Sequence, residues 1–261
     1  LIYNAFEWEI PRYIHCPPVM KDEHNKLSKR NGDASFQDLV AKGYLPGAIL
    51  NYIALLGWSP EEDKEIFTLD ELVQAFNVKH IGKVGAIFDP DKLKWINGMW
   101  LRGMDLDSYY DLVKPYIDQA VKGDFDGKKI AAILQQRAET LVEIPGMLDF
   151  FDEFPAYDNA LYVNKKMKTT LDVSLSSLQA AKETLEAMDE TNWNQENLHS
   201  VLLEIPKKLE RKNGQVLFPL RLALTGKQFT PGGAIEIADI LGKTETLRRL
   251  NLSIAQLDKE V

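Results

Sequence analysis

Signals for helix starts and ends recur along almost the whole chain of 261 residues, and they constrain its fold more than any other feature. The segment "TLDELVQAF" begins with Thr68 and has Glu71 three residues later, which is the capping box of a helix N-terminus. In "PGAILNYIALLGWSP", Pro46 marks a helix start and Gly57 marks its end. Strand signals are few, and the alternation in residues 12–20 is weak. The pattern predicts a mainly α fold made of several helical modules.

The composition is that of an ordinary globular protein, because hydrophobic residues make up 45% and charged residues 27% of the chain. Cys16 is the only cysteine, so no intramolecular disulfide can form and a reducing, cytoplasmic compartment is expected. The four histidines have no ligand spacing, so no metal site is predicted. No apolar run approaches the roughly 20 residues of a membrane helix. We therefore expect a cytoplasmic protein without metal or membrane contacts.

The net charge of −8 argues against indiscriminate nucleic-acid binding, which depends on phosphate neutralisation by lysine and arginine. This net charge does not exclude a local basic surface. Residues 205–231 contain a single acid, Glu210, and this asymmetry indicates a basic face. A solvated surface without a ligand is the alternative. The basic residues of this stretch are Lys207, Lys208, Arg211, Lys212, Arg221 and Lys227.

The segment "NKLSKRNGDAS", residues 25–35, places Lys26, Lys29 and Arg30 within five positions, directly before an Asn-Gly turn. A lysine ammonium is a compact charge that suits phosphate oxygens. Two lysines three residues apart can follow a triphosphate as charge develops during attack on phosphorus. The charges alone favour a solvated hairpin tip over such a phosphate loop, so the choice depends on the surrounding sequence.

That surrounding sequence resembles a known family. "KLSKR" is similar to the Lys-Met-Ser-Lys-Ser loop of class I aminoacyl-tRNA synthetases, with Leu27 in place of Met and Arg30 in place of the last Ser. Residues 11–59 resemble bacterial-type glutamyl-tRNA synthetases continuously. "FDPDKLKWING", residues 88–98, resembles their stem-contact segment, and residues 219–250 resemble their helical anticodon-binding module. Glutaminyl-tRNA synthetases share the loop but carry β-barrel anticodon domains, so the helical pattern favours the glutamyl branch.

The resemblance implies roles for the loop residues. Lys26 and Lys29 would be catalytic and would steady the phosphates of ATP, which is used together with Mg²⁺, while L-glutamate is activated. The residues expected to bind ATP are Lys26, Leu27, Ser28, Lys29 and Arg30. The other family signature, His-Ile-Gly-His, is absent from the sequence. Because the chain also lacks an initiator Met, we expect the Rossmann half to precede Leu1 in a longer parent.

The resemblance also implies contacts with tRNA(Glu). Arg221, Thr230 and Pro231 match residues that contact anticodon bases in related bacterial enzymes. Arg137 matches more weakly, and a buried or ion-paired arginine is an equally open interpretation. In residues 88–98, Lys92 and Lys94 are the candidates for phosphate contact, whereas Asp89 is expected to cap a helix. The aromatic residues expected to lie in a core rather than to contact RNA are Phe88, Trp95, Tyr109, Tyr110, Trp193 and Phe229, and Leu93 is expected to be buried with them.

The resemblance thus implies a mainly α chain with four segments. Residues 1–60 would be a small α/β remnant of the catalytic domain, residues 61–105 a helical stem-contact region, and residues 106–155 and 156–261 two parts of a helical-bundle anticodon-binding domain. We expect this chain to be a monomer that binds tRNA(Glu) and is inactive by itself, with ATP and L-glutamate bound only by the intact enzyme. The alternatives are a helical RNA-binding or scaffold relative without synthetase activity, and an enzyme that is active alone.

Overall fold

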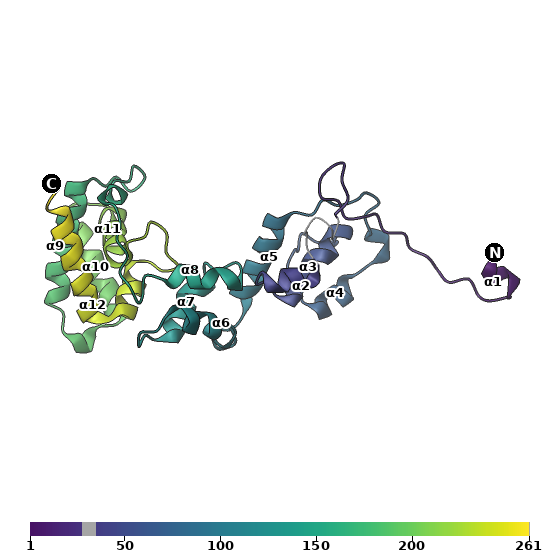
Figure 1. Ribbon diagram of the computed structural model, residues 1–261, viewed down its shortest axis with the longest axis horizontal. Coiled ribbons are helices and arrows are strands. Elements are labelled where there is room, and N and C mark those ends of the chain that lie inside the picture. The colour runs from purple at the N-terminus through teal and green to yellow at the C-terminus, as the bar shows by residue number, and fades with distance from the viewer. Residues whose placement is uncertain (28–34, 261) are drawn as a thin grey trace. The chain divides into compact units, whose positions relative to one another are not determined.

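The computed structural model describes residues 1–27 and 35–260, and it confirms a mainly α fold (Figure 1). The chain divides into two compact units, Leu1–Trp100 and Leu101–Val261, and the boundary falls inside helix α5 (Pro90–Gly103). The division into four segments stays a prediction. In the described residues, the β component of the expected remnant is reduced to isolated bridges that involve Met20 with Lys26, Met20 with Ile87, and Trp58 with Ile81. A further bridge, Asn164 with Thr169, lies in the second unit.

The first unit contains helices whose starts follow the capping signals of the sequence. Thr68 Oγ1 accepts a hydrogen bond from Glu71 N at 3.3 Å, and the Glu71 carboxylate accepts one from Thr68 N at 2.8 Å. Ser35 and Asp38 form a second capping box. These reciprocal bonds satisfy amide groups that a helix leaves without partners at its start. The elements are α1 (Ile2–Ala5), α2 (Phe36–Ala41), α3 (Pro46–Gly57), α4 (Leu69–Ala75), η2 (Val78–His80) and α5.

A buried asparagine holds the core of this unit together. Asn51 on α3 is fully buried, and its Nδ2 donates to the carbonyl of Glu65 at 2.9 Å. Its Oδ1 accepts from Phe67 N at 3.0 Å and from Trp100 Nε1 at 3.1 Å. A buried amide is tolerated where its donors and acceptors are satisfied, as they are here. The apolar core around it includes Leu39, Ala48, Ile49, Tyr52, Leu93 and Ile96.

Helix α5 confirms one expectation from the sequence and corrects another. Asp89 is its N-cap, because its Oδ1 accepts from Asp91 N at 2.9 Å and from Lys92 N at 3.1 Å. Leu93 is buried as expected, whereas Trp95 is 39% exposed, so its assignment to the core was wrong. Successive residues of a helix point about 100° apart. The face that buries Leu93 therefore turns Trp95 towards solvent.

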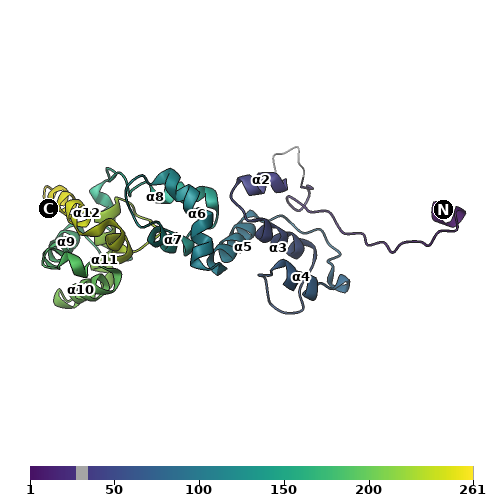
Figure 2. The same ribbon diagram turned by 90° about the horizontal axis from the view of Figure 1, so that it is seen from below.

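The second unit contains two sets of packed helices (Figure 2). Helix α6 (Leu106–Ala120) packs with α7 (Gly127–Gln135) and α8 (Ile144–Leu148), and α9 (Leu171–Glu186) packs with α11 (Asn213–Thr225) and α12 (Ala234–Leu257). Within α12, Gly242 has φ 74° and ψ 169°, and this non-helical conformation kinks the helix. In chain order, the helical elements of the second unit are α6 (Leu106–Ala120), α7 (Gly127–Gln135), η3 (Leu141–Glu143), α8 (Ile144–Leu148), η4 (Asn159–Tyr162), α9 (Leu171–Glu186), η5 (Glu190–Asn192), α10 (Gln195–Lys208), α11 (Asn213–Thr225) and α12 (Ala234–Leu257).

Arg249 of α12 is buried and connects distant segments of this unit through hydrogen bonds. Only 1% of the residue is exposed, and its guanidinium donates to the carbonyls of Phe150, Leu224 and Phe151 at 2.7, 2.8 and 2.9 Å. Its Nε donates to Glu245 at 2.6 Å. A charged group can stay buried when it is paired and hydrogen-bonded in this way. Arg249 thus ties α12 to the end of α11 and to the segment after α8.

Within residues 1–27 and 35–260, no helix combines the length and the apolar character that crossing a membrane requires.

Candidate nucleic-acid interface

A hollow of about 360 Å³ in the second unit brings together four residues predicted from the sequence to contact RNA. Arg137 follows the end of α7, Arg221 lies on α11, and Thr230 and Pro231 lie in the loop before α12. These positions span almost a hundred residues of sequence. The structure also adds residues that the sequence interpretation did not assign to a site: Gly146, Met147, Lys227 and Phe229.

The loop between α11 and α12 sets the geometry of this hollow. Gly226 ends α11 in the left-handed region, with φ 66°, and a Cβ there would lie 2.8 Å from Cγ of Pro155. Glycine is therefore required both by the backbone angle and by the neighbouring ring. The chain then turns back, so that Thr230 meets Arg221. The Thr230 hydroxyl donates in turn to the carbonyl of Gly232 at 2.7 Å.

The Arg221 guanidinium is held by neutral oxygens. Its Nη1 donates to Thr230 Oγ1 at 2.9 Å, and its Nη2 donates to the carbonyl of Gln228 at 2.8 Å. Burial lowers the pKa of Arg221 from its ordinary value, and the nearby positive charge of Arg137 lowers it further. The side chain still carries its charge at pH 7, since an arginine pKa lies far above this pH. The site therefore presents two neighbouring cations that favour an electron-rich acceptor.

The rim of the hollow carries an exposed aromatic ring. Phe229 is 82% exposed, so the expectation that it fills a core was wrong. It lies in the reversing loop, outside the packed face of either helix. Tyr109, in contrast, is fully buried, and the half-buried Trp193 donates from Nε1 to the carbonyl of Ala238 at 2.9 Å. The position of Phe229 directly before the Thr-Pro pair was the one sequence signal that could have assigned it to the site.

Together these groups have the chemistry that an unstacked nucleobase requires. A guanidinium can hydrogen-bond a base edge or stack on a base, and an exposed aromatic ring offers a stacking surface. Pro231 supplies a buried apolar wall. Lys227 contributes less charge, because its ammonium is paired with the carboxylate of Asp149. The arrangement can therefore read single-stranded RNA.

The two lysines predicted to contact RNA phosphates lie on α5, in the first unit. Lys92 Nζ forms an ion pair with Glu65 at 2.6 Å, and both side chains are partly exposed. This carboxylate offsets the positive charge that Lys92 would present to a phosphate. Lys94 is half-buried.

The lysine loop begins beside a short turn in the first unit. Lys26 is exposed and forms an antiparallel bridge with Met20, and Leu27 N donates to the carbonyl of Val19 at 3.0 Å. Leu27 also lines a hollow of about 280 Å³, together with Lys21 and Lys42. Basic side chains therefore lie near the start of the loop. Of the predicted ATP-binding residues, Ser28, Lys29 and Arg30 lie outside the described residues.

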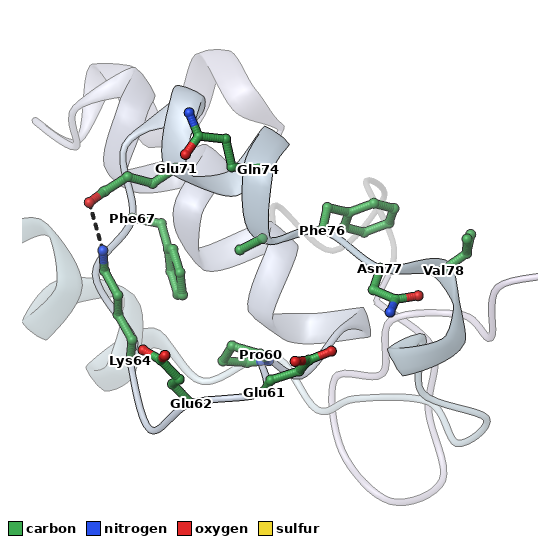
Figure 3. Close-up of a pocket in the computed structure, with 11 residues that line it drawn as sticks. Pro60, Glu61, Glu62, Lys64, Phe67, Glu71, Gln74, Phe76, Asn77 and Val78 are labelled. Atoms are coloured by element: carbon green, nitrogen blue, oxygen red, sulfur yellow. Dashed lines mark hydrogen bonds and ion pairs between the residues drawn. The ribbon is translucent and has the colours of Figure 1, made fainter.

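A larger hollow, of about 680 Å³, lies in the first unit between the segment after α3 and helix α4 (Figure 3). None of the residues predicted from the sequence to form a site lines it. Its Lys64 and Glu71 pair at 2.6 Å, as the dashed line shows, and Lys64 Nζ lies 5.0 Å from the centre of the Phe67 ring. Hydrogen bonds from Lys64 and Thr68 lower the pKa of Glu71 to about 2. Because these two charges neutralise each other, this hollow is a weaker candidate for an RNA-binding site than the hollow around Arg221.

Two family models match the chain. Residues 1–95 match the family of "tRNA synthetases class I (E and Q), catalytic domain", and residues 108–254 match "Anticodon binding domain". Together the two matches cover nearly the whole chain. The second match contains all four predicted residues of the hollow around Arg221.

Curated relatives carry the name glutamate-tRNA ligase. The protein of Clostridium botulinum (strain Hall) is 55% identical over 256 residues, which are 98% of this chain and 52% of the relative. The protein of Clostridium tetani is 55% identical over 260 residues, which are 100% of this chain and 53% of the relative. The chain thus spans about half the length of the curated relatives that it matches.

Solved structures agree with these matches. A glutamate tRNA ligase from Elizabethkingia meningosepticum, in complex with its amino acid, superimposes with a TM-score of 0.79 at 27% identity, over 98% of this chain and 54% of that one. A glutamate-tRNA synthetase from Elizabethkingia anophelis gives a TM-score of 0.77 at 26% identity, over 97% of this chain and 53% of that one.

Proposed function

Because the chain belongs to the glutamate-tRNA ligase family of class I aminoacyl-tRNA synthetases, we propose that it is the tRNA-binding part of such an enzyme and reads the anticodon of tRNA(Glu) in the hollow around Arg221. The observation that carries this proposal is the hydrogen bond between Arg221 and Thr230 beside Arg137. It fixes a cationic group at a concave site within the part that matches an anticodon-binding family.

In this proposal each group of the hollow has its own role. The Arg221 guanidinium, oriented by Thr230, donates to acceptor atoms on a base edge. Arg137 reads a second base, and Pro231 packs against the face of an unstacked base. Phe229 stacks on a base at the rim. Base contacts of this kind specify sequence, whereas phosphate contacts position the RNA. Lys92 and Lys94 are proposed to contact phosphates on the stem of the tRNA and so to position it.

The intact enzyme is proposed to activate L-glutamate with ATP and Mg²⁺ and to transfer it to tRNA(Glu) in the cytoplasm, as a monomer. Lys26 and Lys29 would hold the ATP phosphates, assisted by Leu27, Ser28 and Arg30. Basic side chains near the start of the loop, including Lys21 and Lys42, are compatible with a polyphosphate. The chain by itself is proposed to bind tRNA and not to catalyse the reaction.

The test is binding of the chain to a tRNA(Glu) transcript and to a copy with an altered anticodon, measured by fluorescence anisotropy. We expect the altered copy to bind at least about fivefold more weakly, since a good base contact contributes about 1–3 kcal/mol of discrimination. The Arg221→Gln variant should lose most of this preference. Arg102→Gln, the same change on α5, should keep it. Equal affinities of the unmodified chain for the two transcripts would overturn the proposal.

A further inference from the structure

Two turns that are distant in sequence form one basic surface at the N-terminal end of α11. We call it the two-turn patch. The first turn lies between η4 and α9, and the second comprises the last turn of α10 and its connection to α11. The six lysines are exposed and the arginine is half-buried. The patch consists of Lys165, Lys166, Lys168, Lys207, Lys208, Arg211 and Lys212.

Direct contacts hold the two turns together. Gln215 Nε2, in the first turn of α11, donates to the carbonyl of Lys168 at 3.1 Å, and Gln215 Oε1 accepts from Lys212 N at 3.1 Å. Arg211 Nη1 donates to the carbonyl of Val173 at 3.0 Å and to Ser177 Oγ at 2.8 Å. These bonds fix the second turn against the first turn and the start of α9. The lysines are therefore presented by a rigid base.

The backbone of both turns is unusual. Lys168 has φ 57° and Glu210 has φ 53°, and in the described residues Glu7 is the only other non-glycine residue with positive φ. Such conformations cost of order 1–3 kcal/mol each and persist where the surroundings enforce them. Here they turn the chain sharply within each basic segment, which concentrates the lysines at the turns.

The local charge is opposite to that of the whole chain. Residues 164–172 and 204–212 contain seven basic and three acidic side chains, whereas the chain has a net charge of −8. Part of this charge has a structural explanation. Lys207 and Lys208 lie in the last turn of α10, where cations complement the helix dipole, and Lys207 pairs with Glu204 at 2.7 Å. That explanation does not extend to Lys165, Lys166 and Lys168, which lie outside any helix.

We propose that the two-turn patch binds phosphates of the RNA whose bases enter the hollow around Arg221. This inference rests on the proposed function. Lys212 directly precedes α11, and Arg221 lies nine residues further along, which is about 14 Å at the helical rise of 1.5 Å per residue. A few nucleotides span that distance. Lysine side chains on a fixed base suit the negatively charged oxygens of an RNA backbone, because each contact releases condensed counterions.

The experiment compares the chain with a triple variant, Lys165→Gln, Lys166→Gln and Lys168→Gln, by anisotropy with the tRNA(Glu) transcript at several salt concentrations. A matched control removes three lysines elsewhere in the second unit: Lys114→Gln, Lys128→Gln and Lys259→Gln. Lys114 and Lys128 already pair with Asp118 and Asp107, so their loss should matter little. Thermal unfolding checks that each variant is folded.

We expect the triple variant to bind about tenfold or more weakly and its salt dependence to fall by about 0.7 per lost phosphate contact, in log affinity against log salt. The preference for the correct anticodon should stay unchanged, because phosphate contacts carry no sequence information. An unchanged salt slope would overturn the proposal, as would a loss of affinity for the transcript that is no larger in the triple variant than in the control variant. Loss of anticodon preference in the unmodified chain would instead overturn the proposed function.

Discussion

Arg221 and Thr230 lie nine residues apart in sequence, and the guanidinium of the first donates a hydrogen bond of 2.9 Å to the hydroxyl of the second. The same hydroxyl donates to the carbonyl of Gly232. One side chain of the loop thus orients the arginine and stabilises the turn before α12. The loop and the helix therefore form a single structural element.

Replacing Thr230 by valine should loosen this element. Thr230→Val removes both hydrogen bonds of the hydroxyl, and we expect about 1–2 kcal/mol lower stability because a net hydrogen bond contributes about 0.5–1.5 kcal/mol. Anticodon preference should fall about fivefold or more, measured as the ratio of dissociation constants for the two transcripts. Thr230→Ser keeps the hydroxyl and should behave like the unmodified chain. Equal loss of preference in both variants would show that the hydroxyl does not orient Arg221.

Removing the exposed ring of Phe229 should weaken RNA binding without affecting the fold. The side chain is 82% exposed, so Phe229→Ala removes little buried surface and should leave the melting temperature unchanged within about 1 °C. Base stacking on an aromatic residue contributes about 1–3 kcal/mol, which predicts an affinity loss of about fivefold or more. Phe229→Trp should retain the affinity. Unchanged affinity of the alanine variant would place the ring outside the RNA contact.

Replacing Asn51 should destabilise the first unit. Asn51→Leu leaves the carbonyl of Glu65, the amide of Phe67 and the indole N–H of Trp100 without the partner they now share. Because an unsatisfied buried polar group costs about 1–3 kcal/mol, we expect a loss of about 2–4 kcal/mol. Urea unfolding, monitored by tryptophan fluorescence, measures this loss of stability. Gln74→Leu, which replaces an exposed amide on α4 of the same unit, serves as the control, and a loss as large there would contradict the role of Asn51.

The ion pair of Glu245 should make stability depend on pH. Hydrogen bonds from Arg248 and Arg249 hold the pKa of Glu245 below its ordinary value of 4.5. A carboxylate with a lowered pKa in the folded state stabilises the protein above its ordinary pKa, and this contribution is lost as the pH falls through the folded value. We therefore expect the free energy of unfolding to decrease as the pH is lowered below about 4.5.

The variant Glu245→Gln isolates this contribution. It should be less stable than the unmodified chain at pH 7, by about 1–3 kcal/mol for charged hydrogen bonds. The difference should shrink as the pH falls below 4.5, because the unmodified carboxylate then takes up a proton. Chemical unfolding at a series of pH values measures the difference. Glu183→Gln, an exposed change on α9, is the control, and a pH-independent difference for Glu245→Gln would refute the assignment.

Helix starts were predictable because they depend on neighbours a few residues apart. Thr68 with Glu71, and Asp89 before α5, form their caps as the sequence indicates. The residues that are buried were harder to predict. Trp95 and Phe229 are large and apolar, yet both are exposed, since burial depends on which face of a helix or loop meets a partner. Arg249 is charged, yet it is buried, because three carbonyls from distant segments converge on it.

The amino-acid sequence alone indicated the mainly α fold and the family, and it predicted Arg137, Arg221, Thr230 and Pro231 as residues that contact RNA. These follow from local patterns and short motifs, which do not depend on the path of the chain. Helix packing and loop conformation then placed these four residues around one hollow, with Phe229 at its rim, and brought two lysine-rich turns together at the start of α11. Such proximity arises from helix packing and from the turn at Gly226, where contacts between distant segments outweigh local preference.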